Sequence, residues 1–282
     1  MRDTLYLATS LADAVAALKE RGPDGAPMAG ATWIMRAPLR HERFDFAYVA
    51  LSRIETLRQI EIDDREIGIG ACVTHAALAS ALMGMPGSDA LATAAASAAN
   101  PAVREVATIG GNLCAAGFAA SDLVPALLCL DAQVELETPT GGERMGIDRF
   151  LALRGSLEPG SLLRRIVIQR SPGRSAHIRL PLRKAGDYPV AIVSTAVELA
   201  ADGTVSGMRV AVGSVEAQAR RWKHLESALI GRSLDANFAA SVAEEHSADF
   251  EGRDGVEAPG WYRTKVLASL IRRAVIALQA QA

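Results

Sequence analysis

Apolar residues recur at helical spacing in several segments of the chain. Leu11, Val15 and Leu18 would lie on one face of a helix, and the preceding Ser10 is a residue type that caps helix N-termini, so we predict a helix over residues 11–21. Similar patterns predict helices over residues 75–83 (capped by Thr74), 90–99, 121–130, 147–153, 217–230, 236–245 and 261–279.

Short runs with strand-like alternation lie between the helices. One such run leads into Gly30, and another, Val103 to Asn112, ends in a pair of glycines. The predicted strands cover residues 27–29, 103–112, 133–138, 162–169, and two hairpins, 59–62 with 66–69 and 190–200 with 204–212. The pattern changes after Ser171-Pro172-Gly173, so we place a domain boundary near residue 171 of an α+β protein.

The composition narrows the possible functions. Half of the 282 residues are hydrophobic, which is enough for a large core. A net charge of -2 without long runs of one sign gives no electrostatic basis for nucleic-acid binding. The chain has three cysteines without CxxC spacing, which excludes a disulfide framework and an iron–sulfur cluster on this chain. No signal-peptide or membrane-spanning pattern is present, so we expect a cytoplasmic protein.

The five histidines show no metal-ligand spacing, and no nucleophile or general acid–base pair stands out. We therefore expect neither a metal site nor a catalytic residue on this chain.

The strongest local signal is the run Thr108-Ile109-Gly110-Gly111-Asn112. Two adjacent glycines let the backbone approach a ligand closely, and successive N–H groups in such a turn can bind diphosphate oxygens. Asp122 follows ten residues later at a predicted helix start, where its carboxylate can accept hydrogen bonds from a ribose or an adenine. Taken alone, a glycine pair is more often a structural turn and such an aspartate more often a helix cap.

Two weaker signals flank this one. The loop Ala29-Gly30-Ala31-Thr32 follows the first predicted strand, and its small residues suit phosphate binding by backbone N–H groups. It matches neither a P-loop nor a dinucleotide-binding fingerprint. The run Arg183-Lys184-Ala185-Gly186-Asp187-Tyr188 precedes a long apolar strand and, taken alone, is an ordinary charged turn.

The order of these segments resembles the FAD-binding, or medium, subunit of the xanthine dehydrogenase and carbon monoxide dehydrogenase family. That family pairs a glycine-rich loop near the N-terminus with a Thr-Ile-Gly-Gly-Asn run about 75 residues on. The stretch from Val103 to Leu130 is the best match, and residues 67–74, ending in Thr74, resemble the segment between the two loops. Residues 184–199 and Tyr262-Arg263 resemble the start and the end of the family's C-terminal domain.

The resemblance implies a fold and a domain organisation. Residues 1–170 would form an FAD-binding domain of the p-cresol methylhydroxylase type, with subdomains of about 1–55 and 56–170. Residues 171–282 would form a C-terminal α+β domain with an antiparallel sheet.

The resemblance also implies a site that holds FAD non-covalently. The Gly30 loop and the Gly110-Gly111 pair would hold the diphosphate and ribityl chain, and Ile109 would lie near the flavin ring. Asp122 and the backbone of Leu163 would face the adenosine half. The cation near the flavin would be Lys184 or Arg179. The implied contact residues are Ala29, Gly30, Ala31, Thr32, Trp33, Thr74, Thr108, Ile109, Gly110, Gly111, Asn112, Asp122, Leu163, Arg179 and Lys184.

Two positions of the first loop depart from the family pattern. Ala31 replaces the second glycine of the usual pair, which would cost on the order of 1 kcal/mol if the site needs a positive φ. Trp33 stands where a carboxylate is common.

The resemblance implies an electron-transfer subunit of a molybdenum hydroxylase. A large subunit would carry molybdopterin and oxidise the substrate, and a small subunit with two 2Fe-2S clusters would pass electrons to FAD, in a heterotrimer or its dimer. An external acceptor would then take the electrons. Two alternatives stay open: a structural subunit with a degenerate flavin site, and a stand-alone flavin reductase similar to the enolpyruvyl-sugar reductases.

Overall fold

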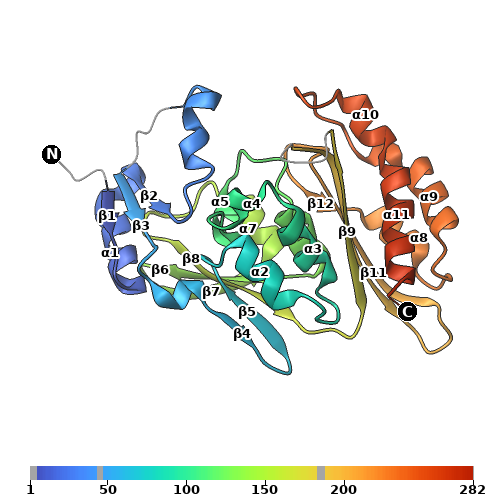
Figure 1. Ribbon diagram of the computed structural model, residues 1–282, viewed down its shortest axis with the longest axis horizontal. Coiled ribbons are helices and arrows are strands. Elements are labelled where there is room, and N and C mark those ends of the chain that lie inside the picture. The colour runs from blue at the N-terminus through green and yellow to red at the C-terminus, as the bar shows by residue number, and fades with distance from the viewer. Residues whose placement is uncertain (1–4, 43–46, 183–187, 282) are drawn as a thin grey trace. The chain divides into compact units, whose positions relative to one another are not determined.

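The computed structural model describes residues 5–42, 47–182 and 188–281 (Figure 1). The chain forms two compact units that are interleaved along the sequence. Unit 1 comprises Met1–Leu78, Pro101–Ala116 and Ala132–Gln169, and unit 2 comprises Ala79–Asn100, Gly117–Asp131 and Arg170–Ala282.

Unit 1 begins with a small parallel sheet. Among the described residues this sheet has the order β1-β3-β2, formed by β1 (Leu5–Leu7), β3 (Ala47–Ala50) and β2 (Gly25–Met28). Helix α1 (Leu11–Arg21) packs against β2 and β3, and Ser10 caps it by accepting a hydrogen bond from the Asp13 N–H at 3.1 Å. The helix buries Ala14, Ala17 and Leu18 in the core of this subdomain.

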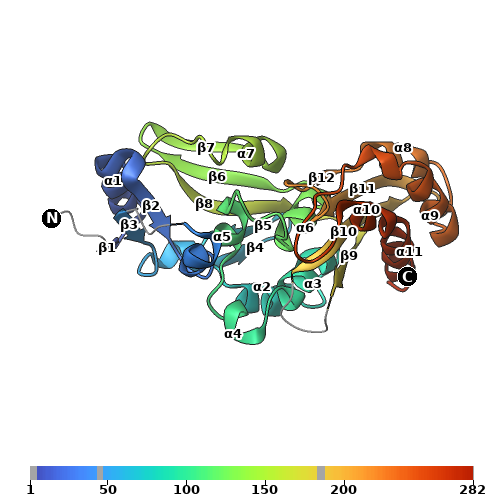
Figure 2. The ribbon, with the colours of Figure 1, turned by 90° about the horizontal axis from the view of Figure 1, so that it is seen from above.

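The second sheet of unit 1 is antiparallel, with the order β4-β5-β8-β6-β7 in the described residues. Its strands are β4 (Ile60–Ile62), β5 (Glu66–Gly70), β8 (Leu162–Gln169), β6 (Gln133–Thr138) and β7 (Gly141–Gly146). Figure 2 shows β6, β7 and β8 running side by side, and α7 (Ile147–Leu153) follows β7. Two short helices, α4 (Pro101–Arg104) and α5 (Ile109–Cys114), complete this part of unit 1, and α2 (His75–Leu82) leads from unit 1 into unit 2.

Unit 2 is a sheet covered by helices on both faces (Figure 1). The described strands have the order β12-β11-β10-β9 and are β9 (Arg174–Pro181), β10 (Pro189–Leu199), β11 (Val205–Gly213) and β12 (Arg220–Arg221). Helices α3 (Asp89–Ser97) and α6 (Leu123–Cys129) pack on one face. Helices α8 (Lys223–Leu229) and α11 (Leu267–Gln279) pack on the other. Helix α9 (Ala236–Glu245) packs against α8 and α11 on the same side, and α10 (Gly260–Lys265) precedes α11.

The four short 3-10 helices of the described chain are η1 (Gly22–Asp24), η2 (Ile34–Arg40), η3 (Glu55–Arg58) and η4 (Ser247–Asp249). Across the described residues, no helix combines the length and the apolar character needed to cross a membrane.

The expected α+β fold class is confirmed, and many of the predicted elements are confirmed with it. Helices 11–21, 147–153 and 236–245 and strands 133–138 and 162–169 have the predicted bounds. Both predicted hairpins form, since β4 pairs with β5 and β10 with β11.

The strand predicted over residues 103–112 is wrong. Pro101 begins α4, a position where its missing N–H costs nothing, and Thr108 then caps α5. Of the β-branched residues that suggested a strand, Thr108 caps a helix and Ile109 is buried in the core, whereas Val106 is exposed. Only Thr108 forms a bridge, to Thr74.

Two further helices are shorter than predicted. The helix expected over 217–230 starts at Lys223, because Arg220 and Arg221 pair with β11 as strand β12. The helix expected over 261–279 is divided at Val266 into α10 and α11.

Candidate functional site

The two glycine-containing segments predicted to bind a cofactor lie against each other within unit 1. A Cβ atom placed on Gly30 would lie 1.7 Å from the carbonyl oxygen of Val106 and 2.7 Å from its carbonyl carbon. No side chain fits there, so glycine is required for the Gly30 loop to approach the segment that leads into Thr108.

Thr108 organises the second segment. Its side-chain oxygen accepts a hydrogen bond from the Gly111 N–H at 3.1 Å, and its carbonyl accepts the Asn112 N–H at 2.9 Å. The N–H groups of Ile109 and Gly110 donate to the carbonyls of Val73 and Ala71 at 3.0 and 2.9 Å. The backbone donors of this first helical turn are therefore committed within the protein. The exposed Gly111 provides close access to the backbone rather than a free N–H group, and Gly110 is buried.

The first loop has the free donors instead. Within the described part of the chain, the backbone N–H groups of Gly30, Ala31 and Thr32 donate to no protein acceptor. Ala31 has φ 56, the left-handed conformation that favours glycine. Consecutive unpaired N–H groups around a left-handed residue form a concave arrangement that suits a phosphate oxygen.

Replacing Ala31 with glycine is expected to stabilise the protein slightly. Glycine removes about 1–2 kcal/mol of left-handed strain but raises the entropy of the unfolded chain by about 0.4–1 kcal/mol. The net gain in the free energy of unfolding is up to about 1.5 kcal/mol. Urea denaturation of the two proteins measures it, and a clear loss of stability in Ala31→Gly would contradict the φ of 56.

The surroundings of Gly111 fit a flavin nucleotide. A Cβ atom on Gly111 would meet only the Thr108 hydroxyl, at 3.0 Å, and Gly111 is exposed, whereas Gly110 is buried against Ala71. One face of the helix start is thus open to a ligand and the other is packed on the protein. The side chain of Ile109 is fully buried, so a ligand would meet this residue through its backbone.

Other predicted residues of unit 1 support the same region. Thr74 caps α2 by accepting the Ala77 N–H at 3.2 Å and bridges to Thr108. Leu163 is buried in β8, and the next residue, Arg164, accepts the Ala71 N–H at 3.0 Å. The Trp33 ring is covered by the Arg40 guanidinium, whose carbon lies 3.9 Å from the ring centroid.

Asp122 and Arg179 form an ion pair in unit 2. Arg179 Nε donates to Asp122 Oδ1 at 2.9 Å, and the aspartate is 5% exposed. Asp122 is the N-cap residue of α6, but its side chain does not cap the helix. The carboxylate is instead bound from strand β9.

Sequence reasoning missed three residues near these segments. His177 Nε2 lies 3.7 Å from Asp122 Oδ1, and His177 Nδ1 hydrogen-bonds with Ser194 Oγ at 2.8 Å. Arg154 donates to the carbonyls of Leu113 and Ala116 at the end of α5. The spacing of these residues gave no signal, because strand pairing and helix docking bring them into place. The predicted cation Lys184 lies outside the described residues.

The two buried cysteines, Cys72 and Cys129, have no environment for thiolate chemistry. Burial raises the pKa of Cys72 to about 11 and that of Cys129 to about 12, so both thiols stay protonated at neutral pH.

Family models match almost the whole chain. The model for the FAD binding domain in molybdopterin dehydrogenase matches residues 1–170, and the model for the CO dehydrogenase flavoprotein C-terminal domain matches residues 176–278. The chain belongs to this FAD-binding family of molybdopterin dehydrogenases. The resemblance seen in the sequence is confirmed.

Individual relatives are similar to this chain over nearly their full lengths. The carbon monoxide dehydrogenase medium chain of Afipia carboxidovorans is 31% identical, with 97% of this chain and 95% of the relative covered. The 6-hydroxypseudooxynicotine dehydrogenase complex subunit alpha of Paenarthrobacter nicotinovorans is 28% identical, with 95% and 91% covered. The structure of carbon monoxide dehydrogenase from Hydrogenophaga pseudoflava superposes with a TM-score of 0.90 at 26% identity, covering 100% of this chain and 99% of that chain. The chain is accordingly an FAD-binding oxidoreductase subunit.

Proposed function

We propose that this chain transfers electrons from the iron–sulfur clusters of a small partner subunit to an external acceptor. A large partner subunit would carry molybdopterin and oxidise the substrate. FAD supplies the redox chemistry of the chain when it is bound, and the protein binds and orients it. The similarity to a medium chain and to a subunit of a dehydrogenase complex supports an assembly of this kind.

The observation that carries the proposal is the pairing of the two loops in unit 1. Gly30 approaches Val106 too closely for any side chain, and this contact fixes the first loop, with its free N–H groups, beside the second. We propose that the N–H groups of Gly30, Ala31 and Thr32 bind the diphosphate and that the open face of Gly111 admits the ribityl chain. Thr108 and Asn112 would add side-chain contacts, with Ala29, Thr74 and Trp33 bordering the loops.

The remaining predicted contacts keep the roles that the family resemblance implies. Asp122 and Leu163 would face the adenosine half. Because Arg179 is bound to Asp122 at 2.9 Å, it would lie with the adenosine half as well, which leaves Lys184 as the proposed cation near the flavin. A domain boundary near residue 171 is part of the same proposal.

The alternative of a degenerate flavin site rested partly on Ala31. Because Ala31 adopts the left-handed conformation itself, the alanine preserves the loop geometry at a small energetic cost. This observation favours a retained site.

Replacing Gly111 with glutamine tests the proposal with little disturbance of the fold. The Cβ of the new side chain would meet only the Thr108 hydroxyl, at 3.0 Å, and the exposed position of Gly111 leaves the longer part of the side chain on the open face. We expect the wild-type chain to bind FAD saturably, FMN to bind more weakly, and Gly111→Gln to weaken FAD binding at least tenfold, or about 1.4 kcal/mol. Flavin absorbance and fluorescence titrations measure the affinities.

Gly142→Gln is the matched control. Gly142 lies in β7, is exposed, and has only the Leu136 carbonyl oxygen near its Cβ position, at 3.9 Å. This variant should bind FAD like the wild type. If the isolated wild-type chain takes up no FAD, the titration is repeated on the complex purified with its partners. Failure of both to bind FAD, or unchanged turnover of the Gly111→Gln complex, would reject the proposal, and turnover by the isolated chain would indicate a stand-alone reductase.

A further inference from the structure

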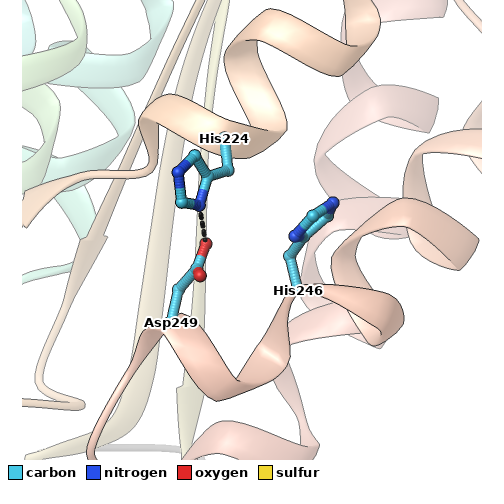
Figure 3. Close-up of side chains that lie close together, drawn as sticks. All are labelled: His224, His246 and Asp249. Carbon is cyan, nitrogen blue, oxygen red and sulfur yellow. Dashed lines mark hydrogen bonds and ion pairs between the residues drawn. The ribbon is translucent and has the colours of Figure 1, made fainter.

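His224 lies close to His246 and Asp249, which follow 22 and 25 residues later, in unit 2 and outside the proposed flavin site (Figure 3). His224 lies in the first turn of α8, His246 is the C-cap residue of α9, and Asp249 ends η4. One ligand atom from each residue lies within 4.8 Å of the others. The expectation of no metal site rested on sequence spacing, which does not show this convergence.

Asp249 is held in place from the side of the core. The indole Nε1 of Trp222, a residue only 1% exposed, donates to Asp249 Oδ2 at 2.8 Å. The same oxygen lies 2.9 Å from His224 Nδ1, as the dashed line in Figure 3 shows. These two hydrogen bonds hold the carboxylate in a fixed position.

The neighbouring cations are already engaged. Arg220 pairs with Glu216, with Nε 2.7 Å from Oε2, and also donates to the main-chain carbonyl of Asp249. Lys223 lies 3.4 Å from Glu226. Their charges are offset by these carboxylates, which lowers the repulsion that a bound cation would meet.

Two imidazoles and one carboxylate are a ligand set of late transition metals, whereas magnesium and calcium prefer oxygen alone. With bonds of about 2.0–2.1 Å, tetrahedral zinc holds its ligand atoms about 3.3 Å apart. The distance of 2.9 Å between His224 Nδ1 and Asp249 Oδ2 is close to this value. The other ligand atoms lie within 4.8 Å of one another, and small side-chain rotations of the exposed His224 and the partly buried His246 would bring them to the distances that zinc requires.

We propose that His224, His246 and Asp249 bind a divalent late transition-metal ion, with Zn²⁺ as the best match, and that water completes the coordination. The ion would link the start of α8 to the end of α9, two helices that cover the same face of the unit 2 sheet. The ion would take no part in flavin binding, and its effect would be to stabilise the packing of these two helices.

Isothermal titration of the chelator-treated full chain with Zn²⁺ tests the site. We expect one ion per chain with a Kd below about 100 µM, weakened at least tenfold in His246→Gln and in Asp249→Asn. Asparagine keeps an oxygen for the Trp222 indole, so Asp249→Asn removes the charge with the least structural change. Saturating Zn²⁺ should also raise the melting temperature of the wild type by about 3–8 °C, but not that of His246→Gln.

His41→Asn is the control for adventitious imidazole binding. His41 is exposed, lies in unit 1, and has φ 57, a conformation that asparagine tolerates. It should bind Zn²⁺ like the wild type. Absence of stoichiometric binding below about 100 µM, or equal binding by the wild type and His246→Gln, would overturn the proposal, because the affinity would not come from these three residues.

Discussion

Replacing Gly30 with alanine is expected to lower the free energy of unfolding by about 3 kcal/mol or more. It should also abolish FAD binding. The added Cβ would lie 1.7 Å from the Val106 carbonyl oxygen and 3.3 Å from the Ala107 Cα, and both are backbone atoms that no side-chain rotation can move away. The two loops would have to separate, and the N–H groups of the first loop would lose their position beside Thr108. Urea denaturation and flavin titration measure the two effects.

Gly111→Ala is the matched control for this change. It makes the same substitution in the second loop, where the new methyl group meets only a hydroxyl at 3.0 Å, and alanine favours a helix by about 1 kcal/mol over glycine. Its stability should equal or exceed that of the wild type. If Gly30→Ala retained wild-type stability and affinity, the close packing of the two loops would not be essential to the site.

Replacing Arg263 with methionine is expected to destabilise the protein by about 3–5 kcal/mol. Arg263 has no exposed surface, and its Nη1 donates to the carbonyls of Val190 at 2.7 Å and Ser214 at 3.1 Å. Its Nη2 binds Glu257 Oε2 at 2.9 Å. Methionine would fill similar space but remove the Arg263 donor from the Val190 carbonyl and from the Glu257 carboxylate, while the Ser214 carbonyl would keep only its hydrogen bond from Arg253 Nε. Arg263→Lys should lose less free energy of unfolding than Arg263→Met, because lysine keeps the positive charge, although it lacks the forked donor geometry of arginine.

Arg272→Met is the control for removing an arginine from the C-terminal helices. Arg272 is exposed on α11, and its Nε donates to Asn237 Oδ1 at 3.0 Å. The free energy of unfolding of this variant should therefore stay within about 0.5 kcal/mol of the wild-type value. Equal melting temperatures for the two methionine variants would show that the buried Arg263 network contributes little to stability.

The local patterns that predicted elements correctly were those in which propensity and packing agree. Ser10 before Leu11 and Asp235 before Ala236 are capping residues followed by an amphipathic run, and both helices form as predicted. The hairpin at Ala201-Asp202-Gly203 formed because its turn residues suit the reversal between two apolar strands. In these segments the information is local and can be read from neighbouring residues.

The failures occurred where distant segments decided the local structure. Considered by themselves, residues 217–221 favour a helix. In the fold, however, Arg220 and Arg221 pair with β11, and the Trp222 N–H donates to the Val210 carbonyl at 2.7 Å. Considered by themselves, residues 103–112 favour a strand. In the fold, however, the carbonyls of Val73 and Ala71 accept hydrogen bonds from the N–H groups of Ile109 and Gly110 and hold these residues in a helical turn. Tertiary hydrogen bonds here outweigh propensities of a few tenths of a kcal/mol per residue.

The sequence by itself indicated the family, the cofactor and the two loops that we propose hold it, because the order of the glycine-containing segments resembles that of the family. The tertiary structure alone decided which of the two loops has backbone N–H groups free to bind the cofactor. It committed the N–H groups of the second loop to Thr108, Val73 and Ala71 and left those of the first loop free. It also paired Asp122 with Arg179 and brought His224 to His246 and Asp249, since side chains far apart along the chain meet only when sheets and helices pack.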